Sequence, residues 1–235
     1  NFPEKDIHEE DDDAIKVAII GKPNVGKSSL INKILGEDRL IVSNIAGTTR
    51  DAVDTPIEID GQKYIFIDTA GMRRKSKIKE EIERFSIIRA VAAVERCDVA
   101  ILLIDANEGV TDQDTKIAGI AHERGKAAII AVNKWDSIDK DEKTMNKYLK
   151  DISMELKYME YAPKVFISAM TGQRINRMLE LIQTVYHNHA LRISTGVLNE
   201  VLIEATAMQQ PPADKGRQLR LYYMTQVSVK PPTFV

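Results

Sequence analysis

A glycine-rich segment near the start of the chain has the residue types and spacing of a phosphate-binding loop. Residues 21–28, GKPNVGKS, fit the pattern G-x-x-x-x-G-K-[ST]. Glycines let the backbone curl so that its N–H groups point at phosphate oxygens, and a helix that begins near Lys27 adds its positive end. Lys27 can reach the β- and γ-phosphates, and the Ser28 hydroxyl can bind Mg²⁺. A glycine-rich turn without a ligand is the alternative. The loop residues expected to contact a nucleotide are Asn24, Val25, Gly26, Lys27, Ser28 and Ser29.

Two further motifs supply groups that can sense a γ-phosphate. Asp68-Thr69-Ala70-Gly71 follows a strand-like run, so Asp68 can hold a Mg²⁺-bound water and the Gly71 amide can face the γ-phosphate. Alone this motif also fits a simple strand-end turn. Upstream, residues 47–51 read GTTRD, and the hydroxyls of Thr48 and Thr49 are candidate ligands. A threonine that joins Mg²⁺ only while γ-phosphate is present makes a switch segment, although a solvated loop is an equal alternative.

The segment Asn133-Lys134-Trp135-Asp136 follows an apolar run and suits recognition of guanine. The Asp136 carboxylate can accept hydrogen bonds from the ring N–H and the amino group of guanine, where adenine presents the opposite pattern. Such a site discriminates strongly because a mismatched base leaves buried groups unpaired. We expect Asn133 to brace the loop, the Lys134 stem to cover the base, and an amide of the Ser168-Ala169 turn to meet the guanine oxygen. The residues expected around the base are Asn133, Lys134, Asp136, Ser168, Ala169 and Met170.

Alternating apolar runs and amphipathic segments position these motifs. Four runs of strand length are predicted to be strands: 15–20, 99–104, 127–132 and 165–167. Residues 53–59 and 64–68 flank Asp60-Gly61 and predict a hairpin. Helices are predicted over 29–36, 79–94, 112–124, 141–158 and 174–189. This order predicts an α/β fold with a mostly parallel sheet covered by helices on both faces. After residue 190 we expect a helix over 193–208 and a strand over 219–229, too few elements for a secure core of their own.

Composition and charge set broad limits. The 235 residues are 43% hydrophobic and 29% charged, as in soluble globular proteins. One cysteine, Cys97, rules out an intramolecular disulfide and is expected in the core. No apolar run predicts a membrane-spanning helix, no signal peptide is visible, and the four histidines predict no zinc site. Residues 1–13 carry seven acidic residues and one lysine, so they read as a linker and the remainder is mildly basic.

The motifs together resemble a known class of protein. Their order and spacing are those of the translation-factor class of GTPases: GKPNVGKS, GTTRD, DTAG, NKWD and SA. Longer phrases resemble the second GTPase domain of the bacterial Der (EngA) family of ribosome-assembly GTPases: GTTRDAVDTPIE, DTAGMRRKSKI, VNKWDSIDKDEKTM, YAPKVFISAMTGQRI and QVSVKPPTFV. The resemblance covers essentially the whole chain. It implies an acidic interdomain linker over 1–13, a P-loop GTPase domain with a Ras-like sheet over 14–190, and the start of an α+β KH-like domain over 191–235.

The resemblance also implies a function. Members of this family are GTP-hydrolysing switches in assembly of the large ribosomal subunit, so GTP, GDP and Mg²⁺ are the expected ligands, with Ser28, Thr49 and Asp68 as Mg²⁺ ligands. The expected partners are the large subunit, its rRNA and the family's first GTPase domain, which this chain lacks. A cytoplasmic, ribosome-associated protein is implied, with neither membrane nor DNA as a partner. Because later KH-like elements are also missing after Val235, we expect a fragment.

The catalytic details are hypotheses. Ras-like GTPases carry a glutamine after D-x-x-G, but this chain has Met72 there, so another group must organise the attacking water. Relatives with asparagine in the phosphate loop hold K⁺ there, which predicts a K⁺ site at Asn24, Ser43 and Ile45 that speeds hydrolysis. Glu83 matches a water-orienting glutamate of relatives, with an exposed helix acid as the alternative. The expected catalytic residues are Lys27, Thr49, Gly71 and Glu83.

The motifs also fit other functions. The motifs GTTRD and DTAG also occur in tRNA-modification GTPases, although that family ends in a cysteine-bearing tail. A guanine-nucleotide-dependent RNA-binding module with negligible turnover is another alternative, and NKWD argues against a phosphotransferase. Residues 73–79 carry five cations and could bind rRNA or could simply be solvated. Tyr222 and Tyr223 are predicted to pack on the partial sheet, with base stacking as the alternative.

Overall fold

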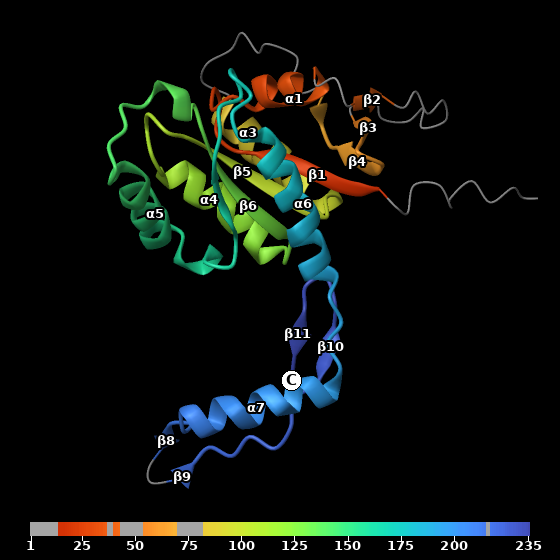
Figure 1. Ribbon diagram of the computed structural model, residues 1–235, viewed down its shortest axis with the longest axis vertical. Coiled ribbons are helices and arrows are strands. Elements are labelled where there is room, and N and C mark those ends of the chain that lie inside the picture. Colours follow the sequence, from red (N-terminus) through yellow and green to blue (C-terminus); the bar gives the residue numbers. More distant parts are fainter. Residues whose placement is uncertain (1–13, 37–39, 43–53, 70–81, 215–216) are drawn as a thin grey trace, which may run out of the picture. The chain divides into compact units, whose positions relative to one another are not determined.

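A computed structural model describes residues 14–36, 40–42, 54–69, 82–214 and 217–235 (Figure 1). The chain divides into two compact units, Asn1–Tyr186 and His187–Val235. Several predictions fall outside the described residues: the linker 1–13, the basic run 73–79, and the site residues Ser43, Ile45, Thr48, Thr49, Gly71 and Met72. The proposed domain boundaries at 13 and 190 stay predictions.

The first unit contains one seven-stranded sheet in the order β2-β3-β4-β1-β5-β6-β7. Its strands are β1 (Ile15–Ile20), β2 (Leu40–Val42), β3 (Thr55–Ile59), β4 (Gln62–Phe66), β5 (Val99–Asp105), β6 (Ala127–Asn133) and β7 (Lys164–Phe166). Strands β4, β1, β5, β6 and β7 are parallel, while β2–β3 and β3–β4 are antiparallel. The mostly parallel sheet predicted from sequence is therefore confirmed. The edge strand β2 was not predicted, because three apolar residues are too short to show a period.

Helices follow the strands as the crossovers of a parallel sheet require. They are α1 (Lys27–Leu35), α3 (Ile82–Arg96), α4 (Asp112–Glu123), α5 (Thr144–Glu155) and α6 (Ile175–Ala190), with short 3₁₀ turns η1 (Trp135–Ser137) and η2 (Lys157–Met159). The helix predicted over 141–158 is shorter than expected. At its start Asp141 accepts hydrogen bonds from the Lys143 amide and the Thr144 hydroxyl, which makes a turn. At its end Leu156, with φ −116° and ψ 45°, separates α5 from η2.

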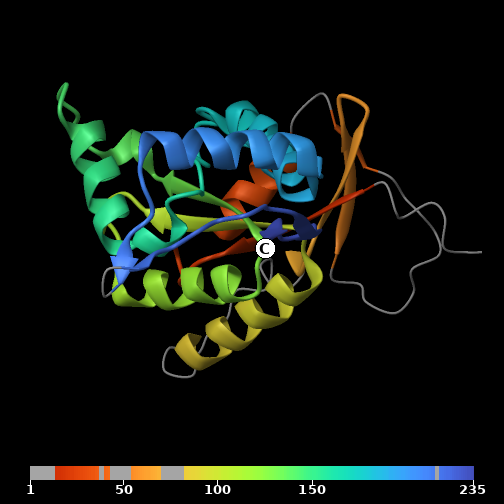
Figure 2. The same ribbon diagram turned by 90° about the horizontal axis from the view of Figure 1, so that it is seen from below.

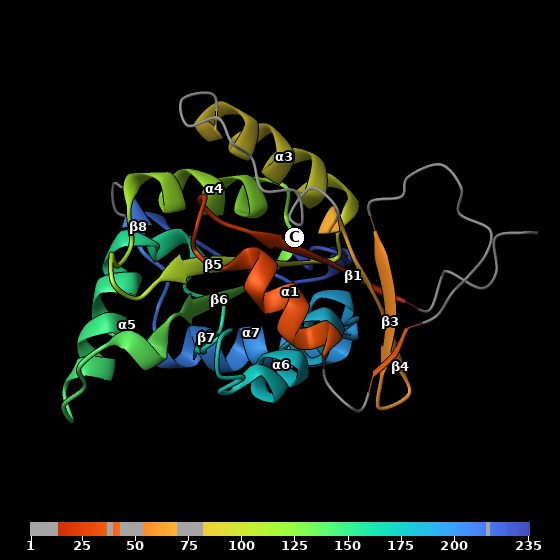
Figure 3. The ribbon, with the colours of Figure 1, turned by 90° about the horizontal axis from the view of Figure 1, so that it is seen from above.

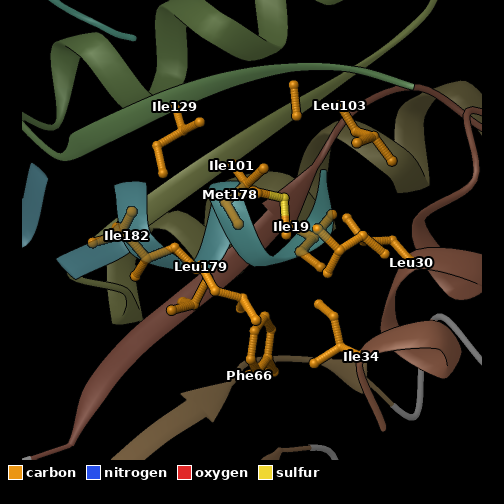
Figure 4. Close-up of a cluster of buried hydrophobic side chains, with 14 of the residues drawn as sticks. Ile19, Leu30, Ile34, Phe66, Ile101, Leu103, Ile129, Met178, Leu179 and Ile182 are labelled. Carbon is orange, nitrogen blue, oxygen red and sulfur yellow. The ribbon is translucent and has the colours of Figure 1, made fainter. Parts of the chain in front are cut away.

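The sheet lies between two hydrophobic cores because side chains alternate along each buried strand. Along β5, Ile101 and Leu103 contribute to one core, while Leu102 and Ile104 contribute to the other. Figure 3 shows α1 and α6 on one side of the sheet and α3 and α4 on the other. In the first core, side chains of α6 meet side chains of β1, β5 and β6 (Figure 4): Met178, Leu179 and Ile182 against Ile19, Ile101 and Ile129. Cys97 is buried in the second core, as expected.

The predicted hairpin is β3–β4, which Figure 2 shows in orange toward one edge of the sheet. Asp60 and Gly61 have φ values of 49° and 82°. Two positive φ values in a two-residue loop define the turn type whose twist suits a hairpin. The hairpin places the residue before β3 beside the residues after β4.

The second unit is built around one helix, α7 (Thr195–Met208), whose first turn is capped by the Ser194 hydroxyl. Two small antiparallel pairs accompany it: β8 (Ala213–Asp214) with β9 (Arg217–Gln218), and β10 (Gln226–Ser228) with β11 (Thr233–Phe234). Among its described residues Leu198 alone is a buried hydrophobic side chain. This agrees with the expectation that the segment has no secure core of its own.

The strand predicted over 219–229 is wrong for most of its length, since only Gln226–Ser228 is a strand. The physical reason is Asn199 of α7, whose Oδ1 accepts the Met224 amide at 2.9 Å and whose Nδ2 donates to the Met224 carbonyl at 3.3 Å. These hydrogen bonds hold the segment against α7 and take the place of the hydrogen bonds of a β-ladder. The packing predicted for Tyr222 and Tyr223 is also wrong, because both rings are largely exposed. None of the helices in the described part of the chain has the length and apolarity needed to cross a bilayer.

Candidate nucleotide site

The glycine-rich loop joins β1 to α1, and its shape depends on two glycines. Gly21 has φ 145° and Gly26, the N-cap of α1, has φ 101°. A Cβ atom on Gly21 would lie 2.5 Å from the Leu103 carbonyl oxygen, and one on Gly26 would lie 2.3 Å from Asn133 Nδ2. Neither position can accept a side chain without local displacement. Asn24, at φ 64°, is exposed within the loop, while Val25 is buried.

Lys27 lies in the first turn of α1 and spans the loop. Its Nζ donates to the carbonyl oxygens of Gly21 at 2.7 Å and Lys22 at 2.6 Å. Burial lowers the pKa of Lys27 to about 8, and the charge of Asp114 acts in the opposite direction. A desolvated cation held by neutral carbonyls beside a helix N-terminus fits a phosphate group, whose charge would offset the burial. Ser28 and Ser29 follow in the same turn.

Lys22 belongs to this loop, although sequence reasoning missed it. It is only 7% exposed, and its Nζ lies 2.6 Å from Glu108 Oε2 and 3.7 Å from Asp114 Oδ2. Asp114 is fully buried, and it completes the capping box of α4 with Thr111. The ion pair of Lys22 with the buried Asp114 therefore joins the loop to the first turn of α4. No sequence signal marks this lysine, since any residue fits its place in the pattern.

Asn133 connects the phosphate loop with the two loops expected around the base. Its Nδ2 donates to the Val25 carbonyl at 2.8 Å, and its Oδ1 accepts the Ala169 amide at 2.9 Å. Asn133 and Ser168 are both buried. These two hydrogen bonds are the bracing contacts expected of Asn133. They also show that one amide of the Ser168-Ala169 turn, that of Ala169, donates to this asparagine within the protein.

The remaining residues expected at the base lie in η1 and after β7. Asp136 is exposed in η1, and Met170 is 83% exposed after β7. Trp135 anchors the turn, because its ring is buried 4.4 Å from that of Phe166 and its amide donates to the Ile167 carbonyl at 3.1 Å. The carboxylate of Asp136 is therefore held outside the core next to a rigid aromatic anchor.

Lys134 has a partner that sequence reasoning missed, Asp105 at the end of β5. Lys134 adopts φ 62°, and its Nζ forms an ion pair with Asp105. Burial acts to raise the pKa of the Asp105 carboxyl, but hydrogen bonds from Lys134 and Asn107 lower it below its usual value. Asp105 thus stays ionised and fixes the lysine. The two residues are 29 positions apart, so only the parallel β5–β6 register brings them together.

Asp68 follows β4 in a left-handed conformation with φ 57°. Its amide donates to Asp54 Oδ1 at 3.0 Å. Glu83 lies in the first turn of α3, but its side chain is outside the described part of the structure. The described residues of the predicted site therefore converge where β1, β4, β5, β6 and β7 end, the edge at which parallel α/β sheets place ligands.

Comparison with known proteins identifies the class. The chain belongs to the family described as 50S ribosome-binding GTPases, whose model matches residues 16–134. Residues 192–235 match the C-terminal KH-domain-like region of EngA bacterial GTPase enzymes. Along its whole length the chain is 64% identical to GTPase Der of Lachnoclostridium phytofermentans and 65% identical to GTPase Der of Lachnospira eligens. It covers 53% of each, so it spans about half the length of these curated relatives.

Solved structures show the same fold. Era in complex with MgGDPNP and a segment of 16S ribosomal RNA is similar with a TM-score of 0.56 and 31% identity, covering 74% of this chain and 57% of that one. A variant of Aquifex aeolicus Era bound to GDP·AlF4⁻ has a TM-score of 0.55 and 32% identity, covering 72% and 56%. The P-loop GTPase fold expected from the sequence is confirmed.

Proposed function

We propose that this chain binds GTP and GDP with Mg²⁺ and hydrolyses GTP to GDP and phosphate. The observation that carries the proposal is the pair of hydrogen bonds made by Asn133, which join the phosphate loop to the loops after β6 and β7. Elements suited to phosphate and elements suited to guanine therefore belong to one site. The relatives named GTPase Der and the Era complexes with guanine nucleotides support the same reading.

At the phosphate end the chain supplies backbone amides and one cation. The loop from Asn24 to Gly26 and the N-terminus of α1 would bind the phosphates, and Lys27 would exchange its carbonyl partners for phosphate oxygens. The hydroxyls of Ser28 and Thr49 would hold Mg²⁺, with Asp68 acting through a bound water and the Gly71 amide binding the γ-phosphate. When bound, Mg²⁺ would supply positive charge that neutralises the phosphates.

At the base end Asp136 decides specificity. Its carboxylate accepts from the N–H and amino group of guanine, whereas an asparagine offers one acceptor and one donor. Asp136→Asn should therefore lose GTP affinity and gain affinity for xanthosine triphosphate, whose C2 oxygen accepts the new donor. Titration of both nucleotides against both proteins tests this. An unchanged preference for GTP in the variant would show that the guanine pocket lies elsewhere.

Ras-like GTPases carry a glutamine where this chain has Met72, so hydrolysis here needs another group to organise the attacking water. We propose that Asn24, Ser43 and the backbone of Ile45 would hold K⁺, which would supply positive charge beside the transferred phosphoryl group, and that Glu83 orients the water. Turnover should then be faster in K⁺ than in Na⁺ at equal ionic strength. Asn24→Ala should abolish the difference, while equal rates in both salts would refute the K⁺ site. Unchanged turnover of Glu83→Ala would remove Glu83 from the mechanism.

The chain is proposed to act as the nucleotide-operated part of a longer, cytoplasmic protein that binds the large ribosomal subunit and its rRNA during assembly. The family description and the Era complex with 16S rRNA support a ribosomal partner. The KH-like match over 192–235 favours this role over a tRNA-modification GTPase. Sedimentation with isolated ribosomal subunits should show binding that depends on a GTP analogue and is weaker with GDP. Binding indifferent to the nucleotide would refute the switch.

A further inference from the structure

We propose that Asp54 is a positioning residue for Asp68, with Arg96 as its counter-ion, and that it sets the Mg²⁺ dependence of GTP binding. The inference deepens the proposed function and rests on it. Asp54 lies outside the short motifs GKPNVGKS, GTTRD, DTAG, NKWD and SA, three residues after the GTTRD segment. Its side chain is 19% exposed.

The contacts of Asp54 come from two directions. Its Oδ1 accepts the backbone amide of Asp68 at 3.0 Å, and its Oδ2 forms an ion pair with the guanidinium of Arg96, the last residue of α3. The hairpin register explains the first contact, because Thr55 pairs with Phe66 and so places Asp54 beside the residues after β4. The two oxygens of one carboxylate therefore engage different elements.

Asp68 needs such a contact because it adopts a left-handed conformation that is unfavourable for a non-glycine residue. A hydrogen bond from its amide to a charged acceptor is stronger than one to a neutral group. The next residue is held by its side chain, since the hydroxyls of Thr55 and Thr69 are 2.6 Å apart and Thr69 is buried. The start of β3 thus fixes the backbone from which the Asp68 side chain projects.

Arg96 acts on Asp54 and not on Asp68. It is half-exposed at the end of α3 and holds the second oxygen of Asp54. The ion pair restricts the rotation of the carboxylate, but the acceptor for the Asp68 amide survives without it. We therefore expect removal of the whole Asp54 side chain to matter more than loss of its charge or of Arg96.

The test compares the affinity for a fluorescent non-hydrolysable GTP analogue over a Mg²⁺ titration and in EDTA. Asp54→Ala should raise the Mg²⁺ concentration at half effect about 10-fold or more, as loss of groups that orient metal ligands does. The affinity in EDTA should stay within about threefold of the unmodified protein. Asp54→Asn, which keeps an acceptor oxygen, and Arg96→Gln should both change the Mg²⁺ midpoint less than about threefold.

Asp98 provides a matched control. Its Oδ2 accepts the Lys16 amide at 3.0 Å, the same kind of bond, but at the amino ends of β1 and β5. Asp98→Ala should leave the Mg²⁺ midpoint unchanged. Equal shifts in Asp54→Ala and Asp98→Ala, or a midpoint in Asp54→Ala within threefold of the unmodified protein, would overturn the inference alone. Absence of Mg²⁺-dependent nucleotide binding in the unmodified protein would overturn the proposed function together with it.

Discussion

Replacement of Asn133 by alanine tests whether one side chain holds the nucleotide site together. The substitution leaves the Val25 carbonyl and the Ala169 amide without their side-chain partner in a region where Asn133 is 2% exposed. A buried polar group left unsatisfied costs about 1–3 kcal/mol, so two such groups cost about 2–6 kcal/mol. A loss near 4 kcal/mol is a large part of the ~5–15 kcal/mol that stabilises a typical domain.

Urea unfolding of the nucleotide-free protein measures this loss, and calorimetric titration with GDP measures the effect on binding. Asn107→Ala is the control, because its side chain is exposed and bonds to Asp105 and Ser137, where water can replace it. We expect that control to lose less than about 1 kcal/mol. Comparable losses in the two variants, or normal GDP affinity in Asn133→Ala, would refute the assignment of Asn133 as the brace between loops.

Three further predictions follow from burial and charge. Lys22→Met leaves the fully buried Asp114 without its cation and should cost about 3 kcal/mol in urea unfolding; a loss below about 1 kcal/mol would mean that the pair is hydrated. The pKa of Lys27 is about 8 in the free protein, and a bound phosphate would raise this pKa. GDP affinity should therefore be constant well below pH 8 and fall as the pH rises through about 8. Fluorescence titrations between about pH 7 and 9 test this, and Lys27→Arg should remove the slope. Met178→Ala, at 0% exposure, should cost about 2–5 kcal/mol, whereas Met154→Ala, at 55% exposure, should cost under about 0.5 kcal/mol by the same assay.

The elements that could be predicted from sequence are those whose residue types directly indicate burial or backbone conformation. Strands β1, β5 and β6 are nearly continuous apolar runs because both of their faces are covered by helices. Asp60-Gly61 identifies the hairpin because few other pairs adopt two positive φ values. The same reasoning is wrong for most of the segment 219–229. Its apolar and aromatic residues suit a strand, but the hydrogen bonds from Asn199 hold its backbone against α7.

The residues of the candidate site likewise fall into those that could be predicted from sequence and those that could not. Residues of the glycine-rich loop and of NKWD are recognisable because their chemistry needs fixed spacing along the chain. Lys22, Asp54 and Asp105 were missed because their partners are distant in sequence, by 86 positions in the pair of Lys22 with Glu108. An isolated aspartate or lysine gives no sign of whether it is solvated or paired. Only the fold supplies that information.

Three ion pairs of the described structure limit which cations can attract a ligand. Lys22, Lys134 and Arg96 each pair with a carboxylate, so their charges are already neutralised within the protein. The hydrogen bonds of Lys27 in the described structure go to carbonyl oxygens, which leave its net charge in place. A phosphate that approaches the loop therefore gains most from Lys27 and the backbone amides around it. Because the charges of Lys22, Lys134 and Arg96 are already matched by carboxylates, phosphate affinity should depend steeply on the charge of Lys27 and much less on theirs.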